Sequence, residues 1–339
     1  MSQPHYFHSQ TNFKLENGAV LPGIDICYHT WGKMNEAKNN VIWICHAFTA
    51  NSDAESWWPG MIGKGCLWDP EQHFIVCANI LGSCYGTTGP LSINAITGKP
   101  FYLDFPALTV RDLVAAHELL RKHLEIDKIH TVVGGSVGAQ QSMEWAIMKP
   151  ETIQHLIIIA ANAQYSPWAI AFNEAQRLAL AADPSFFDHS PTAGQKGLQA
   201  ARGIAMLSYR NHRIYNQTQT EEDQEKTDNF KASGYQQYQG NKLVKRFNAH
   251  SYFVLTKLLD THNVGRNRSG VIAALNSIKA KTLVIGITSD LLFPVEEQQF
   301  IAGHVANARY VEIESLYGHD GFLIETAPIT KIIRLFYQS

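Results

Sequence analysis

The sequence predicts an α/β protein with a mostly parallel central sheet flanked by helices. Three observations support this prediction: short apolar runs recur along the chain, helical patterns separate them, and strand character disappears from one long middle segment. Near-continuous apolar runs are typical of parallel strands that are covered on both faces of the sheet. Strands that alternate with helices indicate βαβ units.

Six runs are expected to be strands. In chain order they are NVIWICHAF at 40–48, HFIVCANIL at 73–81, IHTVVGG at 129–135, HLIIIAA at 155–161, TLVIGITS at 282–289 and ARYVEIES at 308–315. A helix is expected between the second and third runs, because the apolar residues of TVRDLVAAHELLRKHL at 109–124 recur at helical spacing.

The strand pattern is interrupted once, from about Trp168 to Arg268. Helical patterns such as NEAQRLALAA and KGLQAARGIAMLSYR replace it, and the polar stretch NHRIYNQTQTEEDQEKTDN is expected to be a solvated loop or an exposed helix face. We therefore predict a core domain formed by residues 1–167 and 269–339 and an inserted helical lid at 168–268. Such a lid would lie over the carboxyl ends of the strands, where open α/β sheets bind ligands.

Composition and charge disfavour two classes of partner, nucleic acids and membranes. The chain has 339 residues, a formal net charge of −2 and 45% hydrophobic residues, so it offers no basic face for nucleic acid and no polybasic membrane anchor. The N-terminal stretch lacks the pattern of a signal peptide, so we expect a cytoplasmic protein. No C-x-x-C pair occurs, which argues against a disulfide framework or a cysteine zinc site and favours buried thiols. The five cysteines are Cys27, Cys45, Cys66, Cys77 and Cys84.

A Gly-x-Ser-x-Gly pattern surrounds Ser136. The pattern occurs by chance in roughly one chain in ten of this length, so its context matters more than its presence. Here it follows the predicted strand that ends near Val133 and precedes a predicted helix at 140–148. A strand, a sharp turn and a helix are the setting of a nucleophile elbow, with Gly134 and Gly138 allowing close backbone packing. Ser136 is therefore a candidate nucleophile.

Two downstream residues could activate that serine. Asp290 ends a predicted strand, and His319 lies in a glycine-flanked loop after the last predicted strand. Both positions lie at the sheet edge that carries Ser136, and the order Ser, Asp, His is that of an α/β-hydrolase triad. Taken singly, Asp290 could instead cap the next helix, and most of the fifteen histidines must be structural.

An acyl-transfer serine also needs donors for the oxyanion. The segment CHAFTANSD follows the first predicted strand, where α/β-hydrolases keep a loop that lends a backbone N–H. We predict that the backbone N–H groups of Phe48 and Val137 form the oxyanion hole.

Seven segments together resemble one family, the homoserine O-acetyltransferases. They are CHAFTANSDAESWW, NILGSCYGTTGPLSIN, FPALTVRDLVAAHELL, VVGGSVGAQQSMEWA, YQGNKLVKRFNAHSYFVLTKLLDTHNVG, GITSDLLFP and YGHDGFLIE. The likeness covers nearly the whole chain. It implies an α/β-hydrolase fold and a ping-pong transfer of an acetyl group from acetyl-CoA to L-homoserine in methionine biosynthesis. It also implies a homodimer built through the lid helices. No permanently bound cofactor and no metal are expected.

The resemblance also implies how the amino acid is bound. The family positions correspond here to Arg202 and Tyr209 in the lid and to Asp320, directly after the predicted catalytic histidine. Arginine offers a fork that matches a carboxylate, and an aspartate suits an ammonium group. For the coenzyme, the run that contains Lys242, Lys245 and Arg246 could bind phosphates, but a solvated face is the favoured explanation for such a charge run, and no residue is assigned.

Several positions depart from the usual family pattern. They lie near the expected acyl pocket and are Phe48, Ser83, Thr87, Val137 and Ala139. They leave open a succinyl donor and a serine acceptor, while the reaction class is unaffected. A serine esterase could use the same triad, and only the amino-acid site distinguishes it. A non-enzymatic scaffold is disfavoured because all three triad candidates are present.

Overall fold

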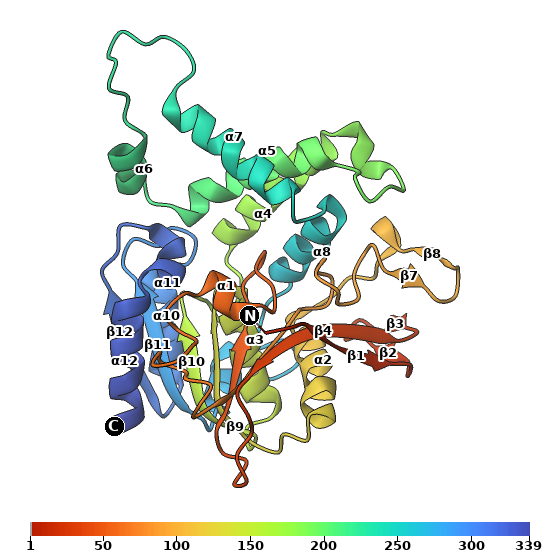
Figure 1. Ribbon diagram of the computed structural model, residues 1–339, viewed down its shortest axis with the longest axis vertical. Helices are drawn as coiled ribbons and strands as arrows, with labels where there is room; N and C mark the ends of the chain where they lie inside the picture. Colours follow the sequence, from red (N-terminus) through yellow and green to blue (C-terminus); the bar gives the residue numbers. More distant parts are fainter. Residues whose placement is uncertain (1) are drawn as a thin grey trace.

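A computed structural model describes residues 2–339 and contains one large mixed sheet (Figure 1). Pairing is parallel from β6 to β12 and antiparallel between β1 and β4 and between β4 and β6. The α/β prediction is thus confirmed. The strands, in spatial order, are β1 (His5–Ser9), β4 (Ile24–Trp31), β6 (Phe74–Ala78), β5 (Val41–Cys45), β9 (Ile129–Gly135), β10 (Ile153–Ile159), β11 (Lys281–Ile287) and β12 (Ala308–Ile313).

The six strands predicted from apolar runs are the six parallel strands. Each strand either has the same number of residues as its run or is one to four residues shorter. The antiparallel strands β1 and β4 were missed. β1 alternates exposed and half-buried residues and lies at the sheet edge, so it lacks the continuous apolar run that marked the others. Two small hairpins also lie outside the prediction, β2 (Phe13–Lys14) with β3 (Val20–Leu21) and β7 (Ile93–Asn94) with β8 (Lys99–Pro100).

Both faces of the sheet are buried under helices. Along β5, Trp43 belongs to one apolar cluster and its neighbours Ile42 and Ile44 to the other, as alternation along a strand requires. The first face packs against α2 (Val110–His123), α3 (Val137–Met148), α9 (Val271–Asn276) and α10 (Val295–His304). The second packs against α1 (Ala54–Trp57), α11 (Gly321–Ile324) and α12 (Thr326–Gln338).

Helix α2 begins with a hydrogen-bonded side-chain cap. The Thr109 side chain accepts the backbone N–H of Asp112, and the Asp112 side chain accepts the backbone N–H of Thr109, which forms a capping box.

Helix α3, predicted at 140–148, begins three residues earlier, at Val137. It is buried all round rather than along one stripe, because strands pack on one side of it and α2 on the other.

Between β10 and β11 the described elements are helices. They are α4 (Pro167–Ala181), η2 (Pro184–Phe187), α5 (Gln195–Tyr209), α6 (His212–Gln219), α7 (Lys231–Val244) and α8 (Ala249–Asp260), followed by α9. We call α4 to α8 the helical segment. Figure 1 shows α4, α5 and α7 gathered beyond one end of the sheet. The polar stretch contains both expected structures, because α6 is followed by an exposed loop.

The five cysteines are free thiols. Cys27, Cys45 and Cys77 are buried, whereas Cys66 and Cys84 are partly exposed. Burial raises the pKa of the Cys45 thiol to about 12, so this sulfur stays protonated and packs as a small apolar group.

Candidate active site

Ser136 occupies the sharp turn between β9 and α3. Its backbone has φ 58° and ψ −130°, a combination that non-glycine residues rarely adopt and that indicates a strained turn. A Cβ on Gly134 would lie 2.2 Å from the carbonyl carbon of Gly138, and one on Gly138 would lie 2.1 Å from the Cys45 oxygen. Gly134 is therefore required for the turn to close on itself and Gly138 for the turn to pack against the end of β5, in line with the close backbone packing expected from the sequence. Ser136 remains partly exposed at its apex.

His319 and Asp290 form a buried pair in the segments that follow the paired strands β12 and β11. His319 Nδ1 lies 2.6 Å from Asp290 Oδ2, and both side chains are almost completely buried. The other carboxylate oxygen, Oδ1, accepts the backbone N–H groups of Leu292 and Phe293 at 2.8 and 3.0 Å. Helix α10 begins later and has Pro294 at its N-cap, so the alternative role of Asp290 as its N-cap is wrong.

The pair determines the basicity of the imidazole. Burial alone lowers the pKa of His319, but the charge and hydrogen bond of Asp290 outweigh it, and the pKa lies above its ordinary value. The opposite ring nitrogen, Nε2, is buried and has no hydrogen-bond partner among residues 2–339. With Nδ1–H donating to Asp290, Nε2 is the atom that can accept a proton.

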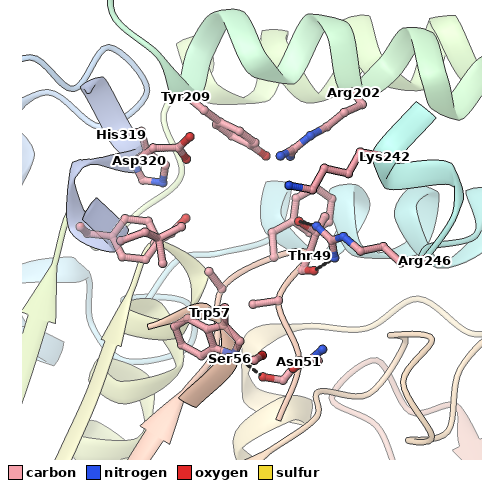
Figure 2. A pocket seen from close by; sticks show the side chains of 16 residues that line it. Thr49, Asn51, Ser56, Trp57, Arg202, Tyr209, Lys242, Arg246, His319 and Asp320 are labelled. Carbon is pink, nitrogen blue, oxygen red and sulfur yellow. Dashed lines mark hydrogen bonds between the residues drawn. The ribbon is translucent and has the colours of Figure 1, made fainter. Parts of the chain in front are cut away.

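Ser136 and His319 line the same cavity, whose volume is about 420 Å³. Asp290 lies behind the imidazole and does not line it. Figure 2 shows His319 and Asp320 on the left of this space, Arg202 at the upper right, and Tyr209 between them at the top. Phe48, Arg202, Tyr209 and Asp320 also line the cavity, together with Lys242 and Arg246.

The two predicted oxyanion donors come from different parts of the chain. Phe48 belongs to the loop after β5 and lines the cavity, and Val137 directly follows Ser136 as the first residue of α3. Neither backbone N–H donates to an acceptor within the part of the chain that the structure describes. Two unpaired N–H groups near a nucleophile are what an oxyanion requires.

Arg202 and Tyr209 lie two turns apart on α5. The Arg202 guanidinium carbon is 5.3 Å from the centre of the Tyr209 ring, and that ring is 5.9 Å from the His319 ring. Burial raises the pKa of Tyr209 to about 12, so its hydroxyl remains protonated and can donate. Helix α5 thus brings one cation and one hydroxyl over the triad.

Asp320 has a partner that the sequence prediction missed. Arg210 Nε lies 2.9 Å from Asp320 Oδ2, and both side chains are largely buried. Burial raises the pKa of the Asp320 carboxyl, and the nearby guanidinium groups of Arg210 and Arg202 only partly oppose that shift. Nothing in the sequence singled out Arg210, because an arginine at a helix end is typical of a solvated surface.

Two exposed residues add further cations to the cavity lining. Lys242 lies near the end of α7, and Arg246 follows two residues after that helix. Arg246 donates to the Thr49 carbonyl and to the Tyr85 hydroxyl, which joins the helical segment to the core. Lys245, named with them from the sequence, does not line the cavity.

Some kinds of site are absent from residues 2–339. No three histidine, cysteine, aspartate or glutamate side chains gather there in a group that could hold a metal ion. No helix described in this range has the length and apolar character needed to cross a bilayer.

Fold and site together define an enzyme class. A family model described as the alpha/beta hydrolase fold matches residues 40–326, so the chain belongs to the α/β-hydrolases. Within them it is 48% identical over 331 residues to a homoserine O-acetyltransferase of Cyclobacterium marinum, covering 98% of this chain and 94% of the relative. The chain therefore belongs to the homoserine O-acetyltransferase family, as its motifs indicated.

Solved structures agree on the fold. The crystal structure of a homoserine O-acetyltransferase from Bacillus anthracis superposes with a TM-score of 0.92 at 26% identity, covering 99% of this chain and 97% of that one. A mutant of esterase E22 superposes with a TM-score of 0.91 at 25% identity, covering 99% of both chains. One backbone thus accompanies two named activities, so the reaction must be argued from the site.

Proposed function

We propose that the protein transfers an acetyl group from acetyl-CoA to the side-chain hydroxyl of L-homoserine, as a step in L-methionine biosynthesis. One observation carries the proposal: a single cavity is lined both by Ser136 and His319 and by Arg202, Tyr209 and Asp320. The first pair suits acyl transfer, and the other three suit the carboxylate and ammonium of an amino acid. An esterase needs only the first pair. The names of the relatives agree with a homoserine acceptor.

In the first half-reaction Ser136 Oγ attacks the thioester carbonyl carbon and transfers its proton to His319 Nε2. Asp290 stabilises the imidazolium that forms, in line with the raised pKa of His319. The N–H groups of Phe48 and Val137 bind the oxyanion. When the tetrahedral intermediate collapses, the carbon–sulfur bond breaks, the thiolate takes the proton from His319 and the free thiol leaves. An acetyl-serine remains.

In the second half-reaction homoserine replaces the thiol product. His319 Nε2 removes the proton from the homoserine hydroxyl, whose oxygen attacks the acetyl carbon. Ser136 leaves as the alkoxide and regains the proton from His319, which gives O-acetyl-L-homoserine and restores the enzyme. Arg202 would bind the carboxylate of the amino acid, with Tyr209 donating beside it, and Asp320 would bind the ammonium group.

We also propose that residues 168–268 act as a lid over the core formed by 1–167 and 269–339. Helix α5 supports this, because it supplies two cavity residues from beyond the end of the sheet. A homodimer through these helices is part of the proposal. Leu207 and Tyr238, on α5 and α7, are 55% and 57% exposed, as side chains of an interface between copies would be.

Intact-mass measurement tests the mechanism. The purified protein is mixed with acetyl-CoA or succinyl-CoA without an acceptor, and homoserine or serine is added afterwards. We expect a mass gain of one acetyl group, discharged faster by homoserine than by serine or water. Ser136→Ala should keep its fold by circular dichroism and gain no mass, because the covalent intermediate cannot form.

Other outcomes identify the alternatives. A succinyl adduct would assign an O-succinyltransferase, and discharge by serine would assign a serine acceptor. An adduct that water clears as fast as any amino acid would assign an esterase, the activity named for one of the similar structures. An adduct on Ser136→Ala would refute Ser136 as the nucleophile.

A further inference from the structure

We propose that Lys242 and Arg246 form the phosphate-binding site for the nucleotide of the acyl donor. This inference rests on the proposed function, because it concerns the coenzyme A thioester that would acylate Ser136. The two cations belong to exposed residues and line the cavity that has Ser136 and His319 in its wall. Figure 2 shows Lys242 and Arg246 side by side above Thr49, on the side of the cavity away from His319.

Charge is the first argument. Arg202, Lys242 and Arg246 line the cavity, yet none of them forms an ion pair with a carboxylate among the described residues. The one carboxylate in the cavity lining, that of Asp320, is paired with Arg210. Cations that lack local counter-charges create a positive potential over a cleft and concentrate anionic ligands there. Arg202 suits the amino-acid carboxylate, which leaves Lys242 and Arg246 for another anion.

Preorganisation is the second argument. Neutral acceptors hold the Arg246 guanidinium: Nη1 donates to the Thr49 carbonyl and, at 2.6 Å, to the Tyr85 hydroxyl. Its charge therefore stays uncompensated while its position is fixed. A guanidinium has five N–H donors, so donors remain for a phosphate oxygen. Fixing a cation before binding reduces the entropy that a ligand must overcome.

The two cations also lie where the phosphates of the donor would be expected. The acyl carbonyl must reach Ser136, and the pantetheine arm separates it from the phosphates by its own length. Lys242 lies in the last turn of α7 and Arg246 in the turn that follows it, and both side chains line the same cavity, so they can act together. They come from the helical segment, while Thr49 belongs to the same core loop as the predicted oxyanion donor Phe48. Phosphates bound here would join the two parts of the protein across the cavity.

The chain supplies a matched control. Lys245 is adjacent to Arg246, exposed and equally charged, but it does not line the cavity. A non-specific effect of net charge would affect Lys242→Ala and Lys245→Ala alike. A phosphate site would affect only the first.

The test compares two donors, acetyl-CoA and S-acetylpantetheine, which has the same thioester and arm but no phosphate. For Lys242→Ala and Arg246→Gln we expect kcat/KM with acetyl-CoA to fall about tenfold more than kcat/KM with the truncated donor, as the loss of a charged hydrogen bond implies. The KM for homoserine should not change. Lys245→Ala should match the wild-type protein with both donors.

Equal losses with both donors, or no loss with either, would refute the phosphate site. A wild-type protein that prefers acetyl-CoA no more than S-acetylpantetheine would refute it too. These results differ from failure of the proposed function, in which the wild-type protein acylates Ser136 from neither donor.

Discussion

Arg210 Nε lies 2.9 Å from Asp320 Oδ2, so the turn that ends α5 is joined by an ion pair to the residue after His319. The same turn donates from Asn211 Nδ2 to the Ser289 carbonyl at 3.3 Å, one residue before Asp290. Two contacts thus connect the end of α5 with both chain segments that carry the histidine–aspartate pair. This relationship makes Arg210 a positioning residue in the proposed reaction.

Removing the guanidinium should change how the protein responds to pH. Arg210 lowers the pKa of Asp320 against the raising effect of burial, so that pKa rises further in Arg210→Met. If Asp320 must be ionised to bind the substrate ammonium, the acidic limb of kcat/KM for homoserine should move to higher pH. Arg210→Lys keeps the charge and should move it less. Identical pH profiles for the three proteins would contradict this role.

Asp320→Asn separates the two half-reactions. The amide keeps the shape but loses the charge that would bind the ammonium, so kcat/KM for homoserine should fall by on the order of tenfold to a hundredfold. The rate of acetyl-enzyme formation, followed by rapid-quench intact mass, should change much less. If both rates fell equally, Asp320 would support His319 rather than the amino acid.

Asp290→Asn should weaken the base. The Asp290 carboxylate raises the pKa of His319, and burial opposes it, so the substitution should lower that pKa. A base works only when it is neutral, so the acidic limb of acetyl-enzyme formation should move to lower pH. The rate on its plateau should fall on the order of 10³-fold to 10⁴-fold because the imidazole loses its orienting partner. An unshifted acidic limb would show that another group determines it.

The capping box of α2 provides a test of stability away from the site. Thr109→Ala removes the side-chain acceptor for the Asp112 N–H, and the free energy of unfolding should fall by about 1 kcal/mol. Urea denaturation measures this change. Thr11→Ala, at an exposed position near the N-terminus, serves as the control and should leave the midpoint nearly unchanged. A midpoint for Thr109→Ala equal to that control would contradict the cap.

Much of the fold could be read from local patterns. Continuous apolar runs identified all six parallel strands, because strands covered on both faces need apolar residues in every position. The glycines around Ser136 indicated the tight turn, because the close approach of Gly138 to Cys45 leaves no room for a side chain. The edge strand β1 escaped because a half-exposed strand has only a weak alternating pattern.

The sequence by itself determined the positions of the six parallel strands along the chain, the turn at Ser136, the family and the chemical types of the candidate groups, since these depend on neighbouring residues and on motifs. Only the tertiary structure decided which cationic side chains line the cavity. It paired Arg210 with Asp320, 110 positions away, and separated Lys242 and Arg246 from Lys245. The physical reason is that the sequence around a charged residue is similar whether its side chain faces solvent or lines a site. The packing of helices that are distant in the sequence determines which groups the side chain contacts, and local propensities do not encode that packing.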